Sequence, residues 1–176
     1  VKEFQTYYSL EVNGNIDEQS LTKLNEVLES PYQRGKRSQE VLELKQKLMR
    51  AGYGTHWKNP TNYYGPDTEK VVRQFQKNNR LVVNGIIDEV TKQRLEDMLE
   101  NGFRKGMSSP LVKDYKLDLM KAGFGTHWKN PTNYYGSDTE KVVKDFQSYY
   151  SLTVDGMLNA ETLQKLNDVL DSPYQR

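Results

Sequence analysis

Two copies of one segment carry the residue types that proteins use to hold sugar rings. The sequence GTHWKNPTNYYG occupies residues 54–65 and recurs unchanged at 125–136. Flat aromatic side chains stack on the C–H faces of sugars, and amide or imidazole groups bind the hydroxyls. Each copy supplies three aromatic rings, one histidine and two asparagines. We therefore expect this segment, with the aromatic residue that precedes it, to contact a polar, uncharged ligand.

The candidate ligand-binding residues share these side-chain types and occupy equivalent positions in the two copies. They are Tyr53, His56, Trp57, Asn59, Asn62, Tyr63, Tyr64, Phe124, His127, Trp128, Asn130, Asn133, Tyr134 and Tyr135. An alternative is that the aromatic rings form a small satellite core that pins a long loop. This alternative has nearly equal weight for the two tryptophans, because a tryptophan in a small domain is usually largely buried. The paired tyrosines look exposed, which favours the ligand role for them.

Neither copy offers a residue set suited to catalysis or metal binding. The chain has no cysteine, and no acidic residue follows His56 or His127 by three or four positions, so metal-ligand spacing is absent. No serine–histidine–aspartate set and no glycine-rich phosphate loop can be assembled. Asp67 and Asp138 stand where a helix should begin, which is a structural role. We expect no catalytic residue, no metal and no cofactor.

The chain as a whole is a tandem array with a period of 71 residues. Residues 52–72 and 123–143 are identical at 19 of 21 positions, and residues 1–34 recur at 143–176, twice that distance away. We therefore predict three domains: a partial repeat over 1–34 and complete repeats over 35–105 and 106–176. Identity outside the loop is much lower, at 7 of 17 positions for 35–51 against 106–122. A simple duplication would diverge more evenly, so either function or local gene conversion keeps the loop constant.

The pattern of apolar residues predicts three helices in each repeat. In the middle repeat, helical spacing over residues 38–51 predicts the first helix, which Gly52 ends. A loop follows, and the second helix begins at Pro66, where in the third repeat Ser137 or Asp138 should cap it. A turn at residues 84–85 leads to a third helix capped by Asp88. The expected fold is all-α: small three-helix domains with a long aromatic loop between the first two helices.

Composition excludes several classes of function. The chain has 25 basic and 24 acidic residues, a net charge of +1, and no polybasic stretch, which argues against nucleic acid as a partner. No apolar run has the length of a membrane span, so we expect no membrane partner. The absence of cysteine fits a cytosolic protein or one exported by a cell that does not rely on disulfides.

The ordered apolar and glycine positions resemble the peptidoglycan-binding domain of bacterial cell-wall hydrolases. In the middle repeat the resemblance is carried by Val41, Leu44, Leu48, Gly52, Tyr53, Gly65, Thr68, Val71, Val72, Phe75, Gln76, Leu81, Val83, Gly85, Asp88, Thr91 and Leu95. The third repeat and the partial first one follow the same pattern. Two features depart from it: the connection between the first two helices is much longer than usual, and Val71 and Val142 replace an alanine.

This resemblance implies a non-catalytic, wall-binding module rather than an enzyme. The expected partners are peptidoglycan glycan or stem peptide and the neighbouring repeats. The array would anchor a larger exported protein of a Gram-positive bacterium or its phage, outside the cell and on the wall. Weak sites would add up through multivalency. The alternatives are a structural surface spacer, in which the loops join the repeats, and a repeat that binds a protein on the same surface.

A tyrosine pair indicates that the array alternates two kinds of repeat. Tyr7–Tyr8 and Tyr149–Tyr150 end the second helix of the first and third repeats, whereas the middle repeat has Asn78–Asn79 there. Residues 1–34 and 143–176 are identical at 21 of 34 positions. We predict that the tyrosine pair packs against the neighbouring repeat at one kind of junction only.

Overall fold

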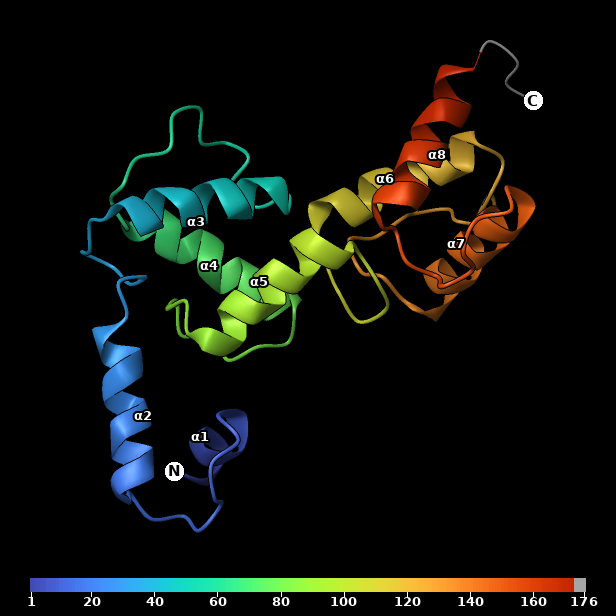
Figure 1. Cartoon of the computed structure of the whole chain (residues 1–176). Helices are drawn as coiled ribbons and strands as arrows, with labels where there is room; N and C mark the ends of the chain where they lie inside the picture. The colour runs from blue at the N-terminus through green and yellow to red at the C-terminus, as the bar shows by residue number, and fades with distance from the viewer. Residues whose placement is uncertain (173–176) are drawn as a thin grey trace. The chain divides into compact units, whose positions relative to one another are not determined.

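A computed structural model describes residues 1–172, and within that range the regular elements are all helices (Figure 1). The prediction of an all-α fold is thereby confirmed. The helices are α1 (Lys2–Tyr7), α2 (Glu18–Glu29), α3 (Gln39–Arg50), α4 (Pro66–Asn78), α5 (Glu89–Asn101), α6 (Pro110–Lys121), α7 (Ser137–Tyr149) and α8 (Ala160–Asp171). None of these helices is long and apolar enough to cross a membrane.

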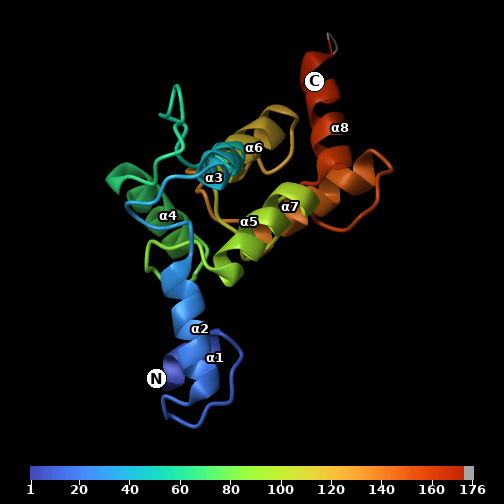
Figure 2. The ribbon, with the colours of Figure 1, turned by 60° about the vertical axis from the view of Figure 1, so that its left-hand side comes forward.

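The chain divides into two compact units. The first contains Val1–Leu48 and Gly54–Arg94, and the second contains Met49–Tyr53 and the residues from Leu95 onward. In the first unit, α1 and α2 lie side by side in both views of the ribbon (Figure 1 and Figure 2). In the second unit, α6 packs against α8. Each unit therefore contains parts of two consecutive sequence repeats.

Short polar side chains begin the third helix of every repeat. Asp88 Oδ1 accepts a hydrogen bond of 2.8 Å from the Thr91 backbone N–H, which confirms the predicted cap of α5. Asp17 caps α2 and Asn159 caps α8 in the same way. The predicted cap of α7 by Ser137 or Asp138 is wrong. Gly136 is the N-cap residue and no side chain caps this end, because both polar residues already lie within the first helical turn.

Each complete repeat buries part of the apolar pattern that its sequence shows. In the first unit the buried side chains are Val41, Leu44 and Leu48 of α3 and Val71, Val72 and Phe75 of α4. In the second unit they are Val112 and Leu119 of α6, Val142, Val143 and Phe146 of α7, and Leu166 of α8. The valines that replace a family alanine are thus ordinary core residues, 8% and 4% exposed at Val71 and Val142.

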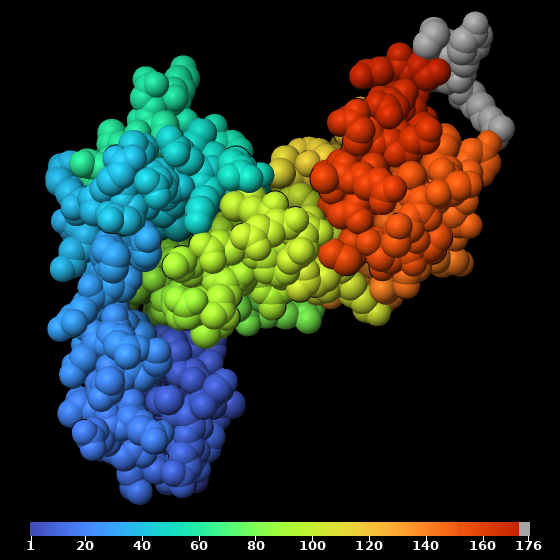
Figure 3. Space-filling view, in the orientation of Figure 1, coloured from blue at the N-terminus to red at the C-terminus, as the bar shows by residue number. Residues whose placement is uncertain are grey.

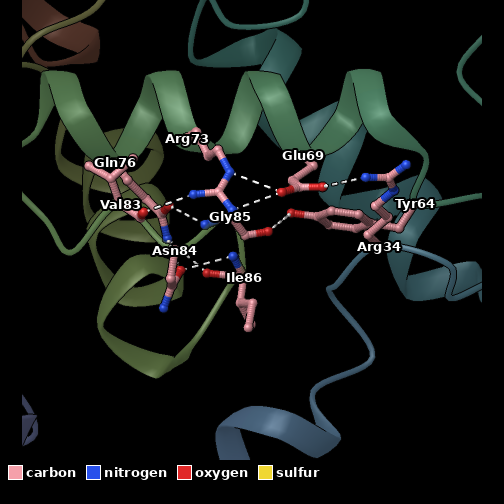
Figure 4. A network of polar contacts seen from close by, with 9 residues as sticks. All are labelled: Arg34, Tyr64, Glu69, Arg73, Gln76, Val83, Asn84, Gly85 and Ile86. Carbon is pink, nitrogen blue, oxygen red and sulfur yellow. Dashed lines mark hydrogen bonds and ion pairs between the residues drawn. The ribbon is translucent and has the colours of Figure 1, made fainter.

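A fully buried glutamine fixes the turn between the second and third helices. Gln76 Nε2 donates to Asn84 Oδ1 and to the Ile86 carbonyl, each at 2.8 Å, and its Oε1 accepts from the Gly85 N–H at 2.9 Å (Figure 4). Gln5 and Gln147 make equivalent bonds in the other repeats. Because a buried polar group must be paired, this clamp determines how the third helix returns along the second.

The second tyrosine of each loop belongs to this core. Tyr64 and Tyr135 are both 0% exposed. Their hydroxyls donate to the carbonyls of Gly85 and Gly156 at 2.8 and 2.7 Å, and Figure 4 shows the Tyr64 ring pointing at Gly85. The expectation that both tyrosines of each pair are exposed is therefore wrong. Burial of a large aromatic ring outweighs the polar character of its tip once that tip has a partner.

Candidate functional site

The segment between α3 and α4 projects from the surface of the first unit (Figure 3). Its far end is held by backbone pairing with the residues that precede α3. The N–H of Gly35 donates to the Tyr64 carbonyl at 2.9 Å, and the N–H of Ser38 donates to the Asn62 carbonyl at 3.1 Å. Residues 106–109 hold the second copy in the same way. The loop is therefore anchored at its base, while most of its tip is exposed.

A tryptophan folds back onto the glycine at the start of each loop. Gly54 has φ +65, and a Cβ built on it would lie 2.5 Å from the Trp57 ring. The second copy repeats this at Gly125 and Trp128, with a distance of 2.6 Å. Only glycine permits both the positive φ and the close approach. Each ring is left half-buried, with part of its surface open to solvent.

One carboxylate joins the tryptophan and the histidine of each copy. Trp57 Nε1 donates to Asp67 Oδ2, and His56 Nε2 lies 2.9 Å from the same oxygen. Asp138 makes both contacts in the second copy. Hydrogen bonds from Trp57 and then His56 lower the pKa of Asp67, and those from Trp128 and His127 lower the pKa of Asp138. The carboxylates are therefore ionised at neutral pH and orient the two rings.

A buried lysine lies beneath each tryptophan. Lys45 Nζ donates to the Tyr63 carbonyl at 2.6 Å and lies 5.5 Å from the centre of the Trp57 ring. Lys116 does the same with Tyr134 and Trp128, at 2.6 and 5.7 Å. Burial lowers the pKa of both lysines. We call the tryptophan, histidine, aspartate and lysine of each copy the tryptophan platform.

Sequence reasoning found only half of this platform. It selected the tryptophan and the histidine, assigned Asp67 to the helix start, and did not assign Lys45 any site role. In the sequence, the one sign that Asp67 and Lys45 belong to the site was their recurrence 71 residues later, as Asp138 and Lys116. His56 hydrogen-bonds Asp67, and its predicted contact with a ligand stays a prediction. Within residues 1–172, no three histidine, aspartate or glutamate side chains gather as a metal site.

The remaining candidate residues divide into loop residues and core residues. Asn59, Asn62 and Asn130 are exposed on the loops, and Asn133 is half-buried. Tyr63 is half-buried with the Arg37 guanidinium 4.3 Å from its ring centre, and Tyr134 is 37% exposed.

Four other candidates lie away from the platform. Tyr53 is 3% exposed and donates to the Ser108 carbonyl, and Phe124 packs edge-on against Phe146. We leave these two, with Tyr64 and Tyr135, out of the site.

A groove along α4 was not anticipated from the sequence. It has a volume of about 390 Å³ and is lined by Arg34, Pro66, Glu69, Lys70, Arg73, Gln74, Lys77 and Val83. Glu69 pairs with Arg73 at 2.8 Å and with Arg34 at 3.8 Å, and Arg73 Nη1 donates to the Val83 carbonyl at 2.9 Å (Figure 4). The lining thus contains four cationic side chains and one carboxylate, so the groove suits an anionic group.

The sequence matches the family of peptidoglycan binding domains over residues 37–95 and again over residues 108–166. Together these ranges cover more than half of the chain. The chain belongs to the peptidoglycan-binding domain family. Both matched ranges begin just before a first helix and end in the third, so each contains one whole tryptophan platform.

Two curated relatives of this peptidoglycan-binding chain are amidases. N-acetylmuramoyl-L-alanine amidase CwlL of Bacillus licheniformis is 24% identical over 163 residues, covering 78% of this chain and 45% of the amidase. N-acetylmuramoyl-L-alanine amidase CwlM of Mycobacterium tuberculosis is 26% identical over 151 residues, covering 75% and 36%. The chain spans less than half the length of these relatives. No solved structure matches it significantly.

Proposed function

We propose that the chain is a non-catalytic array that binds peptidoglycan and holds a larger exported protein on the bacterial wall. One observation carries this proposal: each of the two matched ranges holds the same tryptophan platform, built from the same residue types with nearly the same distances. The proposed location is outside the cell, on the wall. The proposed division is a partial repeat over 1–34 and complete repeats over 35–105 and 106–176.

The tryptophan platform has the chemistry to hold a sugar ring. Part of the Trp57 side chain is open to solvent, and its orientation is fixed by Asp67, Gly54 and Lys45 before any ligand arrives. A sugar stacked on this face would bring its hydroxyls near the exposed His56 and the loop asparagines. A fixed ring loses little entropy on binding, which favours affinity. We assign the glycan strand to this surface.

The groove along α4 has the chemistry to hold a carboxylate of the stem peptide. It shares its helix with the platform, because Asp67 lies in the first turn of α4 and Arg73 lies further along the same helix. The third repeat keeps the central arrangement, with Lys105 and Lys144 paired to Glu140 at 3.4 and 3.3 Å. Glycan and stem peptide would then contact adjacent surfaces of one repeat.

Several weakly binding repeats in one chain would together keep the protein bound to the wall. A polymeric wall presents many ligands, so a second bound repeat raises the effective concentration of the first. We also propose neighbouring repeats as partners of one another within the array.

Pull-down with insoluble peptidoglycan tests the proposal. The site variant is Trp57→Ala combined with Trp128→Ala, and the control is Tyr149→Ala, which removes an aromatic side chain that is 53% exposed outside both loops. Circular dichroism must first show that both variants are folded. We expect the wild type and the control to sediment with the wall and the site variant to remain in solution. Equal sedimentation of all three would contradict the assignment of the site to the platform.

A structural spacer is the second candidate function, and one observation favours it. In the second unit, Ser109 Oγ of the third repeat donates to the Ala51 carbonyl of the middle repeat at 2.6 Å, and Ser109 is fully buried. Specific contacts of this kind are expected in a stacked stalk. If the folded wild type does not bind peptidoglycan from any source, the spacer replaces the binding module as our conclusion.

A further inference from the structure

In the first unit, a partly buried hydrogen bond joins two consecutive repeats. Tyr8 ends the second helix of the first repeat, and its Oη donates to Asp88 Oδ2 in the middle repeat at 2.6 Å. Asp88 is only 5% exposed, and its other oxygen caps α5. Burial raises the pKa of Tyr8, and the Asp88 carboxylate raises it further, so the phenol remains a donor at neutral pH. A bond to a carboxylate is among the stronger hydrogen bonds in proteins.

A serine completes this first junction. Ser30 Oγ donates to the Ile87 carbonyl at 3.1 Å and accepts from the Tyr32 N–H at 3.1 Å. The Ile87 N–H donates to the Tyr32 carbonyl at 3.1 Å. The serine hydroxyl therefore stands between two backbone groups that would otherwise bond directly.

The contact between consecutive repeats in the second unit is built differently. Asn101 and Asn159 of this unit stand at the positions of the serine and the aspartate, and Asn79, which belongs to the first unit, stands in the sequence at the position of the tyrosine. Phe103 and Leu158, the counterparts of Tyr32 and Ile87, bond directly in both directions, at 3.2 and 2.9 Å. The side-chain amides of these asparagines donate within their own repeats, Asn79 to the Phe75 carbonyl, Asn101 to Asp97 Oδ1 and Asn159 to Asp155 Oδ2, at 2.9, 2.9 and 3.0 Å. The residues that form the bond between Tyr8 and Asp88 are thus both replaced at the equivalent positions.

We propose that the Tyr8–Asp88 pair determines which repeat can follow a repeat that ends in the Tyr8 and Ser30 pattern. Such a repeat accepts one with aspartate at the cap of its third helix. If a repeat that ends in asparagine preceded this aspartate, the shorter side chain would leave a buried carboxylate without its donor, which is costly.

The end of the third repeat carries the same pattern as the end of the first. Tyr150 and Ser172 repeat the first pattern, and the Lys165 ammonium lies 5.0 Å from the Tyr150 ring, as Lys23 lies 5.9 Å from that of Tyr8. This face should therefore bind a repeat of the kind formed by residues 35–105. A second copy of this chain is a poor occupant, because its Asp88 is already bonded to its own Tyr8.

A double-mutant cycle in the intact chain tests whether the Tyr8–Asp88 pair holds the two repeats together. The variants are Tyr8→Phe, Asp88→Asn and their combination. Asparagine preserves the cap, since Asn159 Oδ1 accepts from the Thr162 N–H at 2.9 Å in α8. We expect either single change to speed amide exchange in α1 and α2 on the order of tenfold. The combination should add little more.

The equivalent substitution in the third repeat, Tyr150→Phe, is the control. Tyr150→Phe removes the same hydroxyl where the proposed partner repeat is not part of the chain, so exchange in α8 should stay unchanged. Additive effects in the cycle, or equal acceleration of exchange by Tyr150→Phe in α8, would overturn the role of the Tyr8–Asp88 pair.

Two extended chains test the choice of neighbour. One carries a copy of residues 35–105 after Arg176, and the other carries a copy of residues 106–176. With the first extension, Tyr150→Phe should now speed exchange in α8, because an aspartate has become available. With the second extension, Tyr150→Phe should not change amide exchange in α8. The same response in both extensions, or none in either, would show that the tyrosine–aspartate pair does not select the following repeat.

Discussion

At the scale of single residues, adjacent side chains of the loop have opposite roles. Tyr63 is half-buried beside Arg37, whereas Tyr64 is completely buried and bonded to the Gly85 carbonyl. Asp67 likewise does not cap its helix, but orients Trp57 and His56. The position of an acid near a helix N-terminus is favoured by the helix dipole, so one residue can serve both the helix and the platform.

The platform carboxylates should give the protein a titration in acid. Because the pKa values of Asp67 and Asp138 are lower in the folded state, their stabilising effect is complete above the ordinary aspartate value of about 4 and is lost as pH falls through the lower folded value. Trp57 and Trp128 are the only tryptophans. We therefore expect a change in tryptophan fluorescence below about pH 4. Asp67→Asn combined with Asp138→Asn should abolish it, and an unchanged transition would exclude these carboxylates as its source.

The two tyrosines of one loop should differ in their contribution to stability. Tyr135→Phe removes a buried hydroxyl and leaves the Gly156 carbonyl without its donor, which should cost about 1–2 kcal/mol. Tyr134→Phe, at a residue that is 37% exposed, should change the free energy of unfolding by less than about 0.5 kcal/mol. Urea denaturation measures both, and similar losses would contradict the separation of the pair into core and surface.

At the scale of elements, the loop depends on structure at both of its ends. Backbone pairing with the residues before the first helix holds its far end, and the start of the second helix supplies the aspartate that holds its tryptophan. The glycine under the ring permits this arrangement. A loop longer than the family pattern is thus a defined platform rather than a loose insertion.

Alanine substitutions at two glycines can distinguish the effect of backbone strain from the effect of a clash with the Trp128 ring. Gly125 and Gly123 both have positive φ, but a Cβ at Gly125 would lie 2.6 Å from the Trp128 ring, whereas nothing lies within 4 Å of one at Gly123. Both alanine variants should lose about 1 kcal/mol to strain. Only Gly125→Ala should also shift the tryptophan emission and lower binding to peptidoglycan. Identical emission spectra for the two variants would contradict the packing of Trp128 on this glycine.

At the scale of the whole molecule, the proposed function rests on repetition. The platform occurs twice, and each compact unit contains specific contacts between consecutive repeats. Tethered sites of this kind bind a polymer more tightly than either site alone, often by a factor of about 100 or more.

Loss of one platform should therefore be tolerated far better than loss of both. We expect Trp57→Ala or Trp128→Ala alone to lower the fraction retained on insoluble peptidoglycan modestly after washing, and the combination to lower it severely. Dilution and washing must be matched across the variants. Complete loss on removal of either tryptophan alone would indicate one composite site instead of two that act together.

The sequence by itself determined the repeat, the helices and the family. These depend on local spacing: apolar residues at helical intervals, a capping aspartate such as Asp88, and identity at a fixed offset. It also determined that the loop is special, because that segment alone stayed nearly constant between the copies. Tertiary structure decided which loop residues reach solvent. Burial of Tyr64 depends on a carbonyl 21 positions away, and Lys45 reaches Trp57 only because α3 packs behind the loop. Such contacts between distant positions follow from packing, which no local pattern encodes.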